Sequence, residues 1–141
     1  MIFTSYFGKL RKLPDNVFPV AICILPPSWY TGAEYMELAP TFELLAGWKF
    51  GHDSDTYTQR FDSKILGSLD ADRVVTELHL LLPEETRKKM QFRVHNDPDY
   101  HIALLCYEKP DDFCHRHLVA DWLRKNGYEC EELWRDKEEV C

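Results

Sequence analysis

Two stretches of the chain are almost continuously apolar, and each ends where the sequence turns polar or reaches prolines. Val17–Leu25 stops before two prolines, and Ile102–Tyr107 stops before Glu108. Apolar runs of this length without alternation are typical of strands buried on both faces, as in a parallel sheet. Pro19 lacks the N–H that sheet pairing uses, so we expect pairing of the first run to begin after it.

Two further segments complete the expected sheet. Met1–Phe7 is rich in residues that favour strands, and Thr4, Ser5 and Tyr6 lie at its end. Tyr128–Leu133 carries polar residues at alternate positions, a pattern that predicts an edge strand.

The segments between these strands carry the signals of helices. Asp70 is a suitable N-cap, and Asn126-Gly127 is a strong signal for the end of the last helix. Gly8–Asn16 and Gly51–Tyr57 are polar and are expected as a loop and a linker. The predicted helices are Met36–Phe50, Thr58–Leu66, Leu69–Leu82, Glu84–Met90 and 112–126.

This alternation of strands and helices predicts a single α/β domain over residues 1–141, with 134–141 a loose tail. We expect three layers, with a mainly parallel sheet flanked by helices on both faces. Ligands bind such sheets beyond the carboxyl ends of the strands. The loops expected there are Ser5–Lys9, Pro26–Glu34 and Glu108–Cys114.

The last predicted helix brings three polar residues to one end of the sheet. If Leu118–Leu123 supplies the buried face, His115 projects near the middle of that face at 100° per residue. Cys114 and Arg116 flank it, and His117 points towards solvent. We therefore expect the first three residues, but not His117, to line a site.

The chemistry expected there follows from the helix N-terminus, which Asp111 or Asp112 is placed to cap. Unpaired N–H groups attract anions and lower the pKa of a nearby thiol. Cys114 is thus a candidate nucleophile with His115 as its partner, and Arg116 is a candidate for binding phosphate.

Glu108 follows the buried strand and is a candidate general base, ribose acceptor or partner of Arg116. Thr4 and Ser5 are candidate ligand contacts at the end of the first strand. Trp29 and Tyr30 are candidates for stacking on a base, although aromatics after a strand also serve to cover a sheet edge. A cysteine, a histidine and an arginine at such a junction are equally typical of structural roles.

The run Ala103–Leu123 resembles the domain-of-unknown-function-488 family, whose members carry a strand ending in Leu-Cys-x-Glu, a short loop and a helix opening with Cys-His-Arg. Thr4-Ser5-Tyr6 resembles the end of that family's first strand, where many members have Gly-His-Ser. The resemblance implies an α/β fold and a site at the strand–helix junction, and it implies no established activity. The matching residues are Leu105, Cys106, Glu108, Cys114, His115 and Arg116.

The amino-acid composition limits the kinds of partner that the protein is expected to bind. A formal net charge of -7 disfavours non-specific binding to nucleic acid or to anionic membranes. The chain shows no leader and no apolar run long enough to cross a membrane, and its five widely spaced cysteines suit free thiols in the cytoplasm. Cys106 is expected to serve in packing.

We expect no metal and no cofactor. The spacing of Cys106, Cys114, His115 and His117 fits no recognised zinc pattern, and no P-loop or dinucleotide fingerprint occurs. Oligomeric state stays open.

Three hypotheses of function remain. The first is binding or processing of a small anionic ligand, nucleotide-like or phosphorylated, at residues 106–116. The second is a thiol enzyme with Cys114 as nucleophile. The third is a protein-interaction module in which Cys-His-Arg is purely structural. Whether the chain is an enzyme is left undecided by the sequence.

Overall fold

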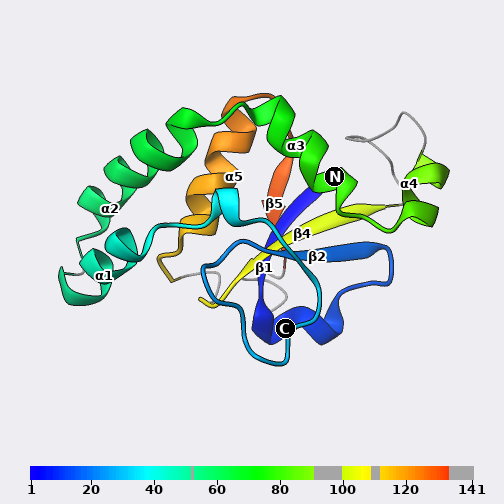
Figure 1. Ribbon diagram of the computed structural model, residues 1–141, viewed down its shortest axis with the longest axis horizontal. Coiled ribbons are helices and arrows are strands. Elements are labelled where there is room, and N and C mark those ends of the chain that lie inside the picture. Colours follow the sequence, from blue (N-terminus) through cyan, green and yellow to red (C-terminus); the bar gives the residue numbers. More distant parts are fainter. Residues whose placement is uncertain (52, 91–99, 109–111, 134–141) are drawn as a thin grey trace.

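The computed structural model of the protein describes residues 1–51, 53–90, 100–108 and 112–133. Its centre is a five-stranded parallel sheet with the order β3-β2-β4-β1-β5 (Figure 1). The predicted α/β class with a parallel sheet is confirmed. The strands are β1 (Ile2–Tyr6), β2 (Val17–Ala21), β3 (Ala33–Glu34), β4 (His101–Cys106) and β5 (Cys130–Glu132).

Nine helical segments connect these strands in the described part of the chain. They include short 3-10 turns and one π-helical segment, η3, which continues α2 towards α3. The segments are η1 (Phe7–Lys12), η2 (Met36–Leu38), α1 (Phe42–Gly51), α2 (Ser54–Arg60), η3 (Phe61–Ile65), η4 (Leu66–Ser68), α3 (Ala71–Leu80), α4 (Glu84–Met90) and α5 (His115–Lys125). No helix of the described residues is long and apolar enough to cross a bilayer.

The two faces of the sheet are covered differently (Figure 1). Alternate residues of β4 face opposite sides because side chains alternate along a strand. Ile102 and Leu104 join the larger core cluster, which also holds residues of α3 and α5. Ala103 and Leu105 join a smaller cluster with Phe7 of η1. A short 3-10 helix thus packs on the second face, where the sequence predicted a loop over Gly8–Asn16.

The strand order explains why connections cover both faces. The chain passes from β1 to β2 across β4 through η1, and from β4 to β5 across β1 through α5. These crossovers run in opposite directions along the sheet, and right-handed crossovers in opposite directions lie on opposite faces. The connections diverge at the carboxyl edge of the sheet, which is where ligands bind in open parallel sheets.

Pro19 does not delay the pairing of β2, so that expectation is wrong. Val17 already pairs with His101, and Pro19 lies opposite Ala103. The short strand β3 reaches only as far as Val20 on the other side, so it needs no N–H from Pro19. The proline is tolerated because it stands where β2 is an edge.

Two predicted boundaries between helices differ from the structure. Pro40 separates η2 from α1, so Met36–Phe50 is not one helix. Gly51–Tyr57 is not a linker, because Asp53 caps α2 by accepting a hydrogen bond from the Thr56 N–H at 3.1 Å. Asp70 caps α3 as predicted, but through the Asp72 N–H. The predicted tail 134–141 lies outside the described residues.

The end of α5 depends on one glycine. Gly127 has a φ of 91°, and the Tyr128 N–H returns to the Leu123 carbonyl at 3.0 Å. We expect Gly127→Ala to lower the free energy of unfolding by about 1 kcal/mol, because a Cβ is unfavourable at this φ. Gly47→Ala is the control: it adds a Cβ into open space on exposed α1 and should be neutral or stabilising. Urea unfolding of both variants measures the difference, and equal effects would contradict it.

Candidate active site

A cavity of about 470 Å³ opens at the carboxyl edge of the sheet. Its walls come from the segments that follow β2 and β4, from α1 and α2, and from the first turn of α5. Some of the residues that line it were predicted as site residues from the sequence, and others were not. The lining residues are Cys23, Ile24, Leu25, Pro40, Phe42, Leu45, Trp48, Lys49, Tyr57, Cys106, Tyr107, Glu108, Phe113, Cys114 and His115.

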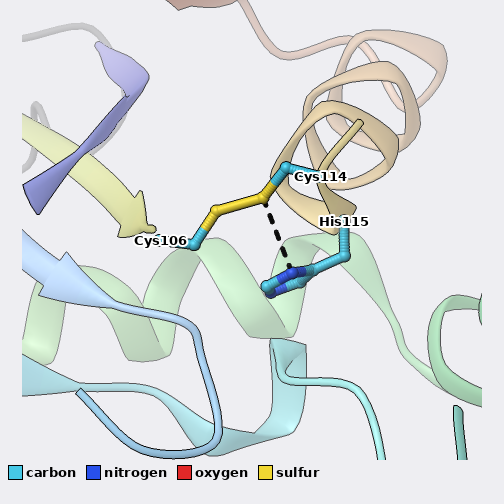
Figure 2. A group of neighbouring side chains, drawn as sticks. All are labelled: Cys106, Cys114 and His115. Atoms are coloured by element: carbon cyan, nitrogen blue, oxygen red, sulfur yellow. Dashed lines mark hydrogen bonds between the residues drawn. A yellow bond between two sulfur atoms is a disulfide. The ribbon is translucent and has the colours of Figure 1, made fainter. Parts of the chain in front are cut away.

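A disulfide joins Cys106, the last residue of β4, to Cys114, the N-cap of α5 (Figure 2). The expectation of free thiols is wrong for this pair, whereas the expected packing role of Cys106 is confirmed, because it belongs to the smaller core cluster. Asp112 does not cap the helix, and Asp111 lies outside the described residues. Among the described cysteines Cys23 and Cys130 are free and buried. The fold thus places two sulfur atoms where a strand and a helix meet.

His115 lies directly beside this disulfide (Figure 2). Its Nδ1 is 3.8 Å from the Cys114 Sγ, and its Nε2 is 2.6 Å from the Ile22 carbonyl oxygen. A carbonyl only accepts, so Nε2 carries the proton and the Nδ1 lone pair faces the sulfur. Burial lowers the pKa of His115 to about 4, helped by the charges of Arg116 and His117 and opposed by the bond to Ile22. The imidazole is therefore neutral at pH 7.

Arg116 is fully buried and makes four hydrogen bonds through its guanidinium. Its Nε and Nη2 donate to the two carboxylate oxygens of Glu132, at 3.0 and 2.7 Å. Its Nη1 donates to the Glu108 carbonyl oxygen at 2.6 Å and to the Cys106 Sγ at 3.1 Å. These contacts fix the end of β4 to β5. Arg116 is not among the residues that line the cavity.

Glu132 is the partner of Arg116 that sequence reasoning missed. Burial alone raises its pKa, but hydrogen bonds and charge from Arg116, with a hydrogen bond from the Thr4 hydroxyl, outweigh burial and hold the pKa below its usual range. One signal was present in the sequence. Cys130 is apolar and two residues away, so the alternation of a strand places Glu132 on the same inward face.

His117 was predicted to face solvent, and this is wrong. Its side chain is 24% exposed, and its Nδ1 lies 3.9 Å from Glu132 Oε1. It lines a second hollow, of about 490 Å³, together with Thr4, Asp121 and Arg124.

The structure brings together only some of the predicted site residues. Glu108, Cys114 and His115 line one cavity. Thr4 and Ser5 are fully buried in β1; Thr4 donates to Glu132 at 2.6 Å, and the Ser5 hydroxyl has no hydrogen-bond partner among the described residues.

Trp29 and Tyr30 lie elsewhere, against the ring of Phe7. The Tyr30 hydroxyl donates to the Ala33 carbonyl oxygen at 2.6 Å, and Trp29 is 57% exposed. Neither lines the cavity beside the disulfide.

Aromatic side chains that the sequence did not single out form one wall of the cavity. The ring of Phe113 lies 4.5 Å from Trp48 and 5.3 Å from Tyr57. Burial, with the charge of Glu108, raises the pKa of Tyr57. Burial also raises the pKa of Cys23 to about 11, so this thiol is protonated at pH 7. Only its place next to Cys114 pointed to Phe113, and the helix predicted at Thr58–Leu66 left out Tyr57 and the first residues of α2.

The chain is thus a parallel-sheet α/β domain in which cysteine and histidine side chains line a cavity at the carboxyl edge of the sheet. A family model described as the active DUF488-N3 subclade matches residues 11–127. The chain belongs to this family of unknown function, which confirms the resemblance seen in the sequence. Comparisons with curated proteins and with solved structures gave no match.

The buried ion pair predicts a loss of stability in acid. The pKa of Glu132 is lowered in the folded state from an ordinary value of 4.5, so its stabilisation is present above that pH. It is lost as the pH falls through the folded-state pKa. We expect Glu132→Gln to remove this part of the pH dependence, because an amide does not titrate.

Urea unfolding between about pH 6 and about pH 3 measures this difference. Glu131→Gln is the control, since the neighbouring Glu131 side chain is exposed. Parallel pH profiles for the wild type and Glu132→Gln would show that Glu132 is not the group responsible.

Proposed function

We propose that this chain is a thiol enzyme, in which reduced Cys114 attacks a small ligand held in the cavity. One observation carries the proposal. Cys114 lines the cavity, and its Sγ is joined to the Cys106 Sγ and lies 3.8 Å from Nδ1 of His115. A nucleophile, a base and a second thiol thus adjoin one space.

The neighbours of Cys114 suit a thiol nucleophile. The neutral imidazole of His115 accepts the thiol proton at Nδ1, while Ile22 holds the ring through Nε2–H. The N-terminus of α5 stabilises the thiolate. After the thiolate bonds to an electrophilic atom of the ligand, the protonated imidazole returns the proton to the leaving group. Glu108 stands in the same cavity as a further acid or base.

Cys106 gives the reduced site a resolving thiol. When a peroxide oxidises Cys114 to a sulfenic acid, Cys106 is close enough to attack it and form the disulfide with loss of water, and a dithiol reductant then restores both thiols. We include a cytoplasmic location in the proposal, because a reducing compartment keeps Cys114 as a thiol.

The walls of the cavity favour a ligand with a flat ring and an anionic group. Trp48, Tyr57 and Phe113 offer aromatic surface for the ring. Lys49 and the first turn of α5 offer positive charge for the anionic group. A nucleotide-like or phosphorylated molecule has both parts, and its size fits about 470 Å³.

The other predicted ligand contacts stay predictions. The guanidinium of Arg116 is engaged with Glu132, Glu108 and Cys106, so we assign it the positioning of these groups. Trp29 and Tyr30 lie on Phe7, and a role for them needs a ligand that extends beyond the cavity.

Alkylation of the reduced protein tests the nucleophile. With a metal chelator present at pH 7, we expect iodoacetamide to label Cys114 about tenfold faster than Cys130, whose pKa burial raises to about 12. His115→Gln should slow the labelling of Cys114, because the proton acceptor is lost. Peptide mapping by mass spectrometry gives the rate at each thiol.

The matched control is His79→Gln, which alters a buried histidine of α3 that does not line the cavity. It should leave the rate at Cys114 unchanged. Equal rates at Cys114 and Cys130, or no effect of His115→Gln in a folded variant, would overturn the proposal.

Thermal unfolding with a panel of nucleosides and nucleotides tests the ligand class. We expect a nucleoside monophosphate to raise the Tm of the reduced protein by about 5 °C near saturation, and the matching nucleoside to raise it less. Lys49→Gln should remove the difference in Tm between the nucleoside monophosphate and the nucleoside. The control Lys64→Gln changes an exposed lysine outside the cavity and should keep that difference. An unchanged Tm across the panel would refute this ligand class while leaving the alkylation result intact.

A further inference from the structure

The sulfur atoms of Cys106 and Cys114 and a ring nitrogen of His115 form a compact group of potential metal ligands. One ligand atom from each residue lies within 4.8 Å of the others. The spacing of these residues in the sequence matches no common zinc pattern. The group is assembled by the fold, which brings the end of β4 to the start of α5.

We propose that the reduced site binds a thiophilic metal ion, Zn²⁺ or Cu⁺, through Cys106, Cys114 and Nδ1 of His115. The 3.8 Å between Cys114 Sγ and His115 Nδ1 is close to the separation of about 3.6 Å between a thiolate and an imidazole on one tetrahedral zinc. Two sulfurs and one imidazole favour these ions over Mg²⁺ or Ca²⁺.

The surroundings of the three ligands have the features of a metal site. His115 donates Nε2–H to the Ile22 carbonyl oxygen at 2.6 Å, which orients the ring and leaves Nδ1 to bind. Arg116 donates to the Cys106 Sγ at 3.1 Å and so stabilises a thiolate there. Both contacts come from groups that are not themselves ligands.

The fourth position of the ion would face the cavity. All three ligands line it, and no other histidine, cysteine, aspartate or glutamate of the described residues joins the group within 4.8 Å. Free Cys23 lies on the same cavity but outside the group. Three protein ligands with one open position are typical of catalytic zinc sites, whereas structural zinc sites have four.

Metal binding and the disulfide exclude each other. A phosphine reductant gives two electrons to the disulfide and takes the oxygen of one water molecule, which leaves two thiols. Each thiol then loses one proton as it binds the ion, so one Zn²⁺ releases two protons. This inference goes beyond the nucleophilic role proposed above, since a metal-bound Cys114 is no longer a free nucleophile.

Cobalt titration of the whole chain tests the site. We expect reduced protein to bind one Co²⁺, with thiolate-to-cobalt charge transfer in the near ultraviolet and the visible bands of tetrahedral cobalt, and Zn²⁺ to displace it. The oxidised protein should show neither. Cys106→Ala and Cys114→Ala should abolish the charge-transfer band, and His115→Gln should weaken binding about tenfold or more.

The controls are Cys23→Ala and Cys130→Ala, which remove the free thiols and should keep the full spectrum. If the Cys106 or Cys114 variants fail to fold, the comparison of oxidised with reduced wild type decides. Absence of the bands in the reduced protein, or their presence in the oxidised protein, would overturn the metal site.

Alkylation distinguishes this inference from the proposed function. Zn²⁺ should slow labelling of Cys114 about tenfold and leave Cys23 unaffected. Fast labelling of Cys114 that Zn²⁺ does not slow would refute the metal site alone. Slow labelling of Cys114 in the absence of metal, together with cobalt binding, would refute the nucleophilic role alone.

Discussion

The buried ion pair between Arg116 and Glu132 is the interaction on which the site depends. Neither side chain is more than 4% exposed, so each charge has lost its water and must be fully compensated by the protein. Glu132 of β5 accepts from the guanidinium and also accepts from the Thr4 hydroxyl of β1, while the Glu108 carbonyl and the Cys106 Sγ accept from the guanidinium at the end of β4. A single side chain therefore fixes three strands relative to the first turn of α5.

That turn sends three consecutive side chains to three different places. Cys114 reaches the end of β4, His115 reaches the segment after β2, and Arg116 reaches β5. Successive residues of a helix differ by 100° in direction, which is enough to separate these destinations. The first turn is thereby held on all sides, and the cavity opens where Phe113 meets the aromatic residues of α1 and α2.

Sequence reasoning predicted four of the five strands and the junction, because continuous apolar runs and an Asn-Gly helix end are local signals; it placed Ala33–Glu34, which forms β3, in a loop. It also selected Glu108, Cys114 and His115, which do line one cavity. It missed the disulfide, Glu132 and the wall formed by α1 and α2, because each depends on how the chain folds back on itself and not on a local pattern. Cys106 and Cys114 are eight residues apart, and only the sharp return from β4 into α5 brings them together. The polar composition of Gly51–Tyr57 likewise led to the prediction of a linker, where α2 in fact begins after its cap at Asp53.

The hydrogen bond between His115 and Ile22 links the tautomer of the imidazole to the alignment of two strands. Ile22 presents its carbonyl oxygen to the imidazole, and its own N–H bonds to the Leu105 carbonyl oxygen at 3.0 Å. The alignment of β2 with β4 therefore decides which nitrogen of the imidazole carries the proton. A slip of one residue would present a differently directed peptide group to the ring. Apolar residues outside the cavity thus specify the tautomer of the candidate base through the alignment of the two strands.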